Sequence, residues 1–118
     1  MARRIVWQPQ KTFNSASLSS SYQAMTDASS AAGLVNPCRQ FFIQNLSSVS
    51  VQVSFDGIND AFPVVSSGFY VSDISTNNLN SPSDEGPMLQ QGTIVYLKQV
   101  TAAGTGSIYF SCWNESGD

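Results

Sequence analysis

The stretch that decides the fold is Val49-Ser50-Val51-Gln52-Val53-Ser54-Phe55, in which apolar and polar residues alternate at every position. Successive side chains of a β-strand point to opposite faces, so this alternation predicts a strand that buries one face and exposes the other. We expect the apolar residues Val51, Val53 and Phe55 to face the core. The polar residues Ser50, Gln52 and Ser54 should lie on the opposite face of the strand.

The segments on either side of this stretch also have strand and turn character. Residues 40–46 form a denser apolar run, which predicts a more fully buried strand. The short polar break Ser47-Ser48 fits a hairpin between the two strands. Asp56-Gly57 follows the second strand and predicts a turn, because glycine accepts a positive φ and aspartate closes an Asx-turn.

Period-2 patterns continue along most of the chain. In the last of them, we expect Ile108, Phe110 and Cys112 to face the core. Residues 75–91, rich in Asn, Pro, Asp and Gly, predict a long loop. Further strands are predicted at residues 16–24 (weak), 62–65 (an edge strand marked by Pro63), 69–74, 93–99 and 107–113, with a loop or short helical turn at 25–36.

These patterns predict an all-β fold. A chain of 118 residues and 12.7 kDa forms one domain, and six or seven strands around one core make a single antiparallel β-sandwich, of which the jelly roll is one arrangement. We place an extended basic N-terminal arm at residues 1–13 and the sandwich domain at residues 14–118.

Composition argues against most enzyme classes. Histidine is absent, which removes the usual general base at neutral pH and the commonest metal ligand. We expect no catalytic site, no cofactor and no metal, and we expect Cys38 and Cys112 to be reduced thiols. The net charge of -3 argues against nucleic acid as a partner, and no apolar run approaches the roughly 20 residues of a membrane span.

Three weaker constellations have both a functional and a purely structural interpretation. The run 56–60 could hold calcium, but it lacks the spacing of an EF-hand and is better explained as a tight turn. Asp73, Asp84 and Glu85 could act as paired carboxylates, but the last two lie in a polar loop and are better explained as solvated charges. Four aromatic residues could form a platform for a sugar or a protein: Trp7, Tyr70, Tyr109 and Trp113. For Tyr70 and Tyr109, packing in the core is the alternative interpretation.

The first residues combine cations with large apolar side chains. Three of the five basic residues stand at positions 3, 4 and 11, whereas residues 12–118 hold two cations and all eight acids. A solvated, frayed terminus is one interpretation. The other is an arm that is mobile in isolation, docks on a neighbouring subunit and can be deleted without loss of the fold. The partner-interface residues predicted on this second interpretation are Arg3, Arg4, Ile5, Val6, Trp7, Lys11, Phe13 and Trp113.

Several phrases together resemble small structural proteins of tailed bacteriophages. The pattern is Phe42-Ile43-Gln44-Asn45-Leu46-Ser47-Ser48 leading into Val51-Gln52-Val53-Ser54-Phe55-Asp56-Gly57, with similar phrases at 73–77, 92–96 and 106–110. The resemblance spans about residues 39–113. It implies a compact β-sandwich of the virion, assembled in the host cytoplasm, that acts as a head decoration (cement) protein or as a head-neck or tail component.

The resemblance and the composition point to the same class of function. We expect a non-enzymatic capsid decoration protein that binds the major capsid protein or other virion proteins, as a homo-oligomer or on a lattice. The first alternative is a head-tail connector or tail component. The second is a carbohydrate-binding sandwich module, with Trp113 and the 75–91 loop as its platform.

Overall fold

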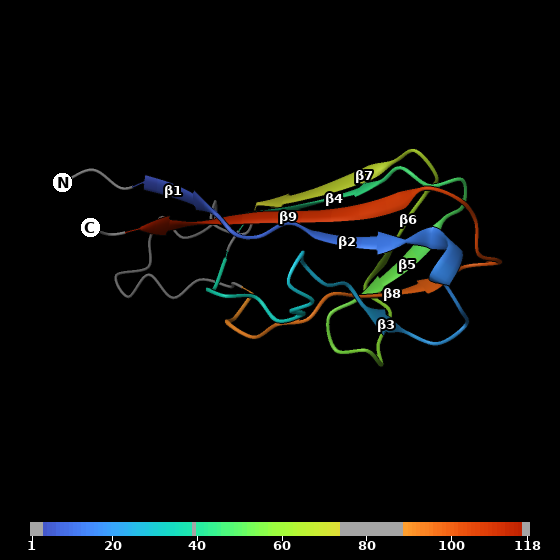
Figure 1. Ribbon diagram of the computed structural model, residues 1–118, viewed down its shortest axis with the longest axis horizontal. Coiled ribbons are helices and arrows are strands. Elements are labelled where there is room, and N and C mark those ends of the chain that lie inside the picture. The colour runs from blue at the N-terminus through green and yellow to red at the C-terminus, as the bar shows by residue number, and fades with distance from the viewer. Residues whose placement is uncertain (1–3, 39, 74–88, 117–118) are drawn as a thin grey trace.

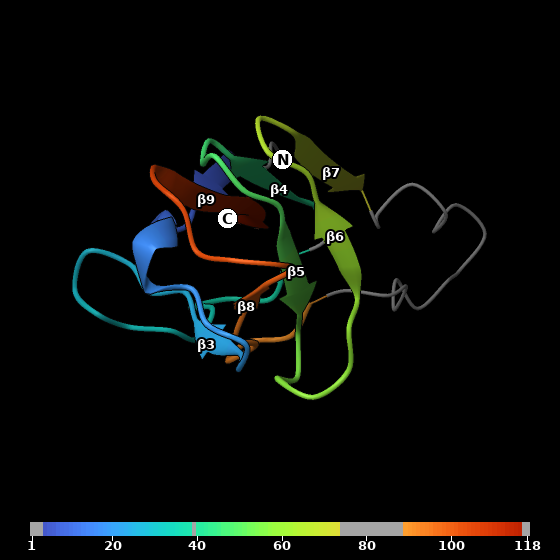
Figure 2. The ribbon, with the colours of Figure 1, turned by 90° about the vertical axis from the view of Figure 1, so that its right-hand side faces the viewer.

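Two antiparallel sheets face each other across one apolar core in the computed structural model, which describes residues 4–38, 40–73 and 89–116 (Figures 1 and 2). One sheet has five strands and the other has four. The strands are β1 (Arg4–Trp7), β2 (Lys11–Asn14), β3 (Gln23–Ala24), β4 (Gln40–Asn45), β5 (Val51–Ser54), β6 (Phe62–Val64), β7 (Phe69–Asp73), β8 (Tyr96–Gln99) and β9 (Ser107–Ser116), with a 3₁₀ turn η1 at Ser15–Ser17.

The strand pairs are nested in the order of the chain. β2 pairs with β9, β3 with β8, β4 with β7, and β5 with β6, all antiparallel. The five-stranded sheet has the order β1-β9-β4-β7, with β2 also on β9, and the four-stranded sheet has the order β3-β8-β5-β6. Nested pairs that alternate between two sheets define a jelly roll. The predicted all-β antiparallel sandwich is therefore confirmed, with its connectivity now defined.

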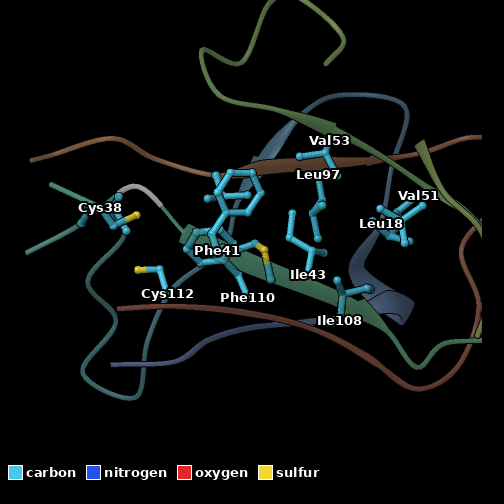
Figure 3. Packing of buried hydrophobic residues seen from close by; sticks show 14 residues of the cluster. Leu18, Cys38, Phe41, Ile43, Val51, Val53, Leu97, Ile108, Phe110 and Cys112 are labelled. Atoms are coloured by element: carbon cyan, nitrogen blue, oxygen red, sulfur yellow. The ribbon is translucent and has the colours of Figure 1, made fainter. Parts of the chain in front are cut away.

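The core lies between the inner faces of the two sheets (Figure 3). Ile43 from β4, Val53 from β5 and Ile108 from β9 have no exposed surface, and Val51, Val95 and Phe110 are equally well buried. The predicted facing of β5 and β9 is thus confirmed at these positions, and Cys112 also faces inward.

Two positions next to the deciding stretch differ from the prediction. Strand β5 ends at Ser54, so the alternation does not extend through Phe55, which is only half-buried. Ser54 is fully buried instead of facing outward, and its hydroxyl accepts hydrogen bonds from the backbone N–H groups of Asp56 and Gly57 at 3.2 and 3.0 Å. The turn itself is as predicted, with Gly57 at φ 77°.

The predicted hairpin at Ser47-Ser48 is wrong. β4 and β5 belong to different sheets, so this segment carries the chain across the core. The buried Asn45 side chain supplies hydrogen bonds that the backbone ladder of a hairpin would otherwise make. Its amide donates to the carbonyls of Val49 and Val64 at 2.8 and 3.0 Å. Its Oδ1 atom accepts the Ser47 N–H at 3.0 Å.

The N-terminal segment lies along β9 for most of the length of that strand (Figure 1). β1 pairs with the C-terminal part of β9, and β2 pairs with its N-terminal part. Pro9 falls in the interruption between them, where a residue without an N–H costs no ladder bond. The structure thus differs from the expected boundary at residue 13, because residues 11–14 form a strand of the sandwich.

Other segments match the prediction to different degrees. The edge strand at 62–65 is confirmed as β6, at the margin of the four-stranded sheet. The weak strand predicted over 16–24 is mostly wrong, because it contains η1 and only the two residues of β3. The strand predicted at 93–99 begins only at Tyr96. Most of the loop predicted at 75–91 lies outside the described residues.

Candidate functional site: the outer face of the five-stranded sheet

The five-stranded sheet turns one side away from the core, and the register of its strands defines which residues share that side. Gln40 lies opposite Trp113, Phe42 lies opposite both Val71 and Ser111, and Gln44 lies opposite both Phe69 and Tyr109. On the far side of β9, Trp7 pairs with Trp113 and Thr12 with Tyr109. We call this set the outer face: Trp7, Thr12, Gln40, Phe42, Gln44, Phe69, Val71, Tyr109, Ser111 and Trp113.

Large apolar side chains on the outer face are exposed to solvent. Trp7 is 62% exposed, Phe69 68% and Val71 57%. The rings of Phe42 and Phe69 lie 6.3 Å apart between centroids, so they form one continuous apolar area across β4 and β7. Contiguous exposed apolar surface on a soluble protein marks a binding surface more often than isolated exposed residues do.

The polar members of the outer face are neutral. Gln40, Gln44, Ser111 and Thr12 carry amides or hydroxyls, and Gln10 at the rim donates to the Ser111 hydroxyl at 3.1 Å. Among outward-facing residues whose side chains the structure describes, none is charged. Depletion of charge together with enrichment of aromatic residues is the composition of the core of a protein interface.

The structure brings together some of the predicted interface residues. Trp7 and Trp113 are register partners on the same face, 62% exposed and half-buried respectively. Val6, 36% exposed, lies on the opposite side of β1 from Trp7. Arg4 and Ile5 are placed in the backbone of β1, whereas Arg3 lies outside the described residues.

Lys11 and Phe13 belong to the inner side of the sheet, so neither can serve as an exposed interface residue. They pair with Phe110 and Ile108, which face the core. Lys11 is only 2% exposed, and its ammonium donates to the carbonyls of Ala31 and Gly33 at 3.5 and 3.3 Å. The alternation of the strand, with Thr12 outward, forces this orientation on both neighbours.

The aromatic residues considered for a platform divide between the two sides of the sheet. Trp7, Tyr109 and Trp113 share the outer face. Tyr70 is on the inner side, where it stacks on Phe62 at 4.1 Å and closes the gap between the edges of the two sheets.

Sequence reasoning missed Phe42, Phe69 and Val71. Phe41-Phe42-Ile43 is apolar at three consecutive positions, and Phe69-Tyr70-Val71 is aromatic or branched at every position, so periodicity could not tell which side faces water. The missing alternation could itself have indicated exposed apolar residues, since a strand with one solvated face normally alternates apolar and polar residues.

A polar cluster at the turn after β5 has ordinary structural roles. The Asp56 carboxylate accepts the N–H groups of Asn59 and Ile58, each at 2.8 Å, and these bonds hold the pKa of that carboxyl well below its usual range. A carboxylate so occupied explains the turn without calcium, and among the described residues no group of His, Cys, Asp or Glu is arranged to hold a metal ion.

Tyr22, Asp60 and Lys98 form a second polar cluster on the four-stranded sheet. Tyr22 donates to Asp60, and the Lys98 ammonium lies 3.4 Å from the same carboxylate and 4.7 Å from the centroid of the Tyr22 ring. Burial, followed by the bond to Asp60, raises the pKa of Tyr22, and the Tyr22 bond lowers the pKa of Asp60. These shifts favour a neutral phenol and an ionised carboxylate, which are the ordinary forms at neutral pH.

Comparisons with known proteins found no match: no family model, no curated protein and no solved structure resembles the chain significantly. Within the described residues, no helix is long and apolar enough to cross a membrane.

Proposed function

We propose that this chain is a non-enzymatic structural protein of a tailed-phage virion, and that it decorates the head by attaching its outer face to capsid subunits. The observation that carries the proposal is the outer face itself: Trp7, Phe69 and Val71 are exposed there, and its members named above are all uncharged. Short phrases between residues 39 and 113 resemble phage structural proteins and suggested this class, although the comparisons with known proteins returned no such relative. Jelly rolls occur among viral capsid proteins and lectins alike, so the fold is compatible with the proposal without deciding it.

The composition of the outer face suits attachment to another protein. Apolar area contributes about 25 cal/mol per Å² on burial, and strands that are already ordered lose little entropy when they bind. Neutral glutamines and serines at the same surface can form hydrogen bonds without the desolvation cost of ions. Repeated weak contacts over a capsid lattice add up through multivalency. The partners are therefore the major capsid protein or other virion proteins, or copies of this chain arranged on the shell.

The direct test uses two matched valine variants. Val71→Ser removes an apolar side chain that is 57% exposed on the outer face, whereas Val100→Ser removes one that is 50% exposed beyond the end of β8. We expect Val71→Ser to lower occupancy on particles produced by the genome that encodes the chain, and Val100→Ser to bind as the unmodified protein does. Quantitative mass spectrometry of purified particles, with circular dichroism of the free variants, measures both. Equal occupancy of the two variants would refute attachment through this face.

The distribution of the protein on particles separates decoration from a connector or tail role. Immunogold labelling over the whole shell supports decoration. Labelling confined to one vertex or to the tail supports the connector or tail alternative, and absence from particles rejects every virion role.

A carbohydrate-binding module is the second candidate, favoured by one observation. Trp7 and Trp113 pair in register on a flat sheet face, with Gln40 opposite Trp113 as a hydrogen-bonding neighbour. Exposed aromatic rings beside amides can stack on sugar rings and bond their hydroxyls. A glycan array distinguishes the candidates: binding that is lost in Trp7→Ala but kept in Val71→Ser supports a sugar site, and no binding to any glycan leaves the protein-attachment proposal.

A further inference from the structure

Two cysteines from distant parts of the chain meet at one end of the core. Cys38 precedes β4, Cys112 lies in β9, and they are 3% and 2% exposed. Both are free thiols, and their sulfur atoms point toward each other (Figure 3). The two side chains interact directly, and each shifts the pKa of the other.

Backbone pairing holds both residues in place. Cys38 exchanges two hydrogen bonds with Leu89, from its N–H at 2.9 Å and to its carbonyl at 2.8 Å. Cys112 is the register partner of Phe41, and its carbonyl accepts the Gln8 N–H at 3.0 Å. Both backbone segments are already held in place by these contacts. The chain therefore loses little further entropy when the two thiols form a bond.

We propose that Cys38 and Cys112 form an oxidation site, at which a small peroxide converts the two thiols into an intramolecular disulfide. In the first step the Cys38 thiolate attacks hydrogen peroxide: an S–O bond forms, the O–O bond breaks, and hydroxide leaves. In the second step the Cys112 sulfur attacks the sulfenic acid of Cys38. An S–S bond forms, the S–O bond breaks, and the oxygen leaves as water with the Cys112 proton. The two thiols lose two electrons, and the peroxide is reduced to water.

The contact between the thiols affects the two groups in opposite directions. The interaction with Cys112 lowers the pKa of Cys38, whereas the interaction with Cys38, followed by burial, raises the pKa of Cys112. The thiolate is the reactive form of cysteine, so Cys38 is oxidised first and Cys112 resolves the intermediate. A small oxidant is required because both side chains are buried.

The disulfide would fasten the segment before β4 to β9. The loop that it closes spans most of the chain, and a cross-link over a long loop removes much entropy from the unfolded state. This chemistry does not depend on the proposed virion role. If that role holds, the protein would fold with reduced thiols in the cytoplasm and become cross-linked after release into an oxidising medium.

The test compares reduced protein with protein treated with hydrogen peroxide under folding conditions. We expect the intact mass to fall by two hydrogen atoms, the free thiols measured after denaturation to disappear, and a non-reducing gel to show a monomer. The melting temperature should rise by roughly 10–20 °C and return to its starting value with dithiothreitol. Thiols that remain free, or cross-linked dimers, would overturn the proposal. So would a gain of oxygen without a cross-link.

Single-cysteine variants test the order of reaction. Cys112→Ala should accumulate a sulfenic acid on Cys38 that dimedone traps, because its resolving partner is missing. Cys38→Ala should react much more slowly, because the remaining thiol is protonated and buried. Equal dimedone labelling of the two variants would contradict the assigned order even if the unmodified protein forms the disulfide.

Discussion

Asn45 is fully buried at the point where the chain leaves one sheet for the other, and its side chain uses every bond that an amide offers there. Two carbonyls accept its Nδ2 protons, while Ser47 donates to its Oδ1 atom from both N–H and hydroxyl. These contacts satisfy backbone groups that no sheet ladder reaches. One polar residue thereby stabilises the crossing between β4 and β5.

We expect Asn45→Ala to lower the free energy of unfolding by about 2–4 kcal/mol, because it leaves several buried backbone groups without partners. Gln44→Ala, one position away and only half-buried, is the matched control and should change stability by less than about 0.5 kcal/mol. Urea denaturation curves with unchanged slopes provide the measurement. Similar midpoints for the two variants would show that the Asn45 contacts contribute nothing net.

Asp56 gives a prediction of acid sensitivity. The bonds from Asn59 and Ile58 lower the pKa of Asp56 in the folded protein below the value of about 3.9 expected in the unfolded chain. The folded state therefore favours the ionised form, so the stabilisation is complete above the unfolded pKa and is lost as the pH falls toward the folded pKa. Asp56→Asn should be less stable than the unmodified protein at neutral pH, with a smaller gap near about pH 3. Urea midpoints at both pH values test this, and a constant gap would argue against it.

Among the strands, the N-terminal segment forms two consecutive pieces, β1 and β2, that are separated around Pro9. β1 carries Val6 and Trp7, which are 36% and 62% exposed. Gln8, by contrast, is 8% exposed, donates to the Asn36 carbonyl and accepts the Val35 N–H. Lys11 is buried against the segment that contains Ala31. The structural contribution of this segment therefore begins after β1.

Two deletions separate these parts. Removing residues 1–7 should lower stability by about 1 kcal/mol or less, because the described side chains that it removes, those of Val6 and Trp7, are exposed. Removing residues 1–11 should lower stability by several kcal/mol, since it also leaves the partners of Gln8 and Lys11 unpaired in a buried site. The sequence alone favoured an arm that could be removed without loss of the fold. Equal thermal stability of the two deletions would support that interpretation.

For the whole molecule, the nested pairing brings the first strands of the chain against the last. β2 can pair with β9 only after the chain between them has been closed into a loop, and β3 and β8 repeat this constraint. Non-local pairing of this kind slows folding, because loop-closure entropy is lost before the contacts that compensate for it form.

We expect refolding from urea on a timescale of milliseconds to seconds, as for other β-sandwiches rich in non-local pairs. Stopped-flow fluorescence of Trp7 and Trp113, which meet only when β1 lies on β9, reports on this closure. Ser111→Ala, at a half-buried position of the same strand, leaves both tryptophans in place and controls for local effects on the signal. Refolding within microseconds would contradict a rate set by topology.

The sequence by itself determined the fold class and most strand positions. Alternation of apolar and polar residues depends on local backbone geometry, so Val51, Val53 and Phe110 could be assigned to the core before any pairing was known. The same reasoning failed where apolar residues follow one another without alternation, as around Phe42 and Val71, because periodicity then carries no information on facing. It also failed at Lys11, where a cation stands in an inward position.

Only the tertiary structure decided which strands share a sheet. Ser47-Ser48 has the composition of a hairpin turn, yet it crosses between layers, because burial of both sheets' inner faces outweighs pairing of neighbouring strands. The outer face joins Trp7, Phe42, Val71 and Trp113 through strand register, and Cys38 meets Cys112 across the end of the core. These juxtapositions depend on contacts between residues far apart in the chain, which no local pattern encodes.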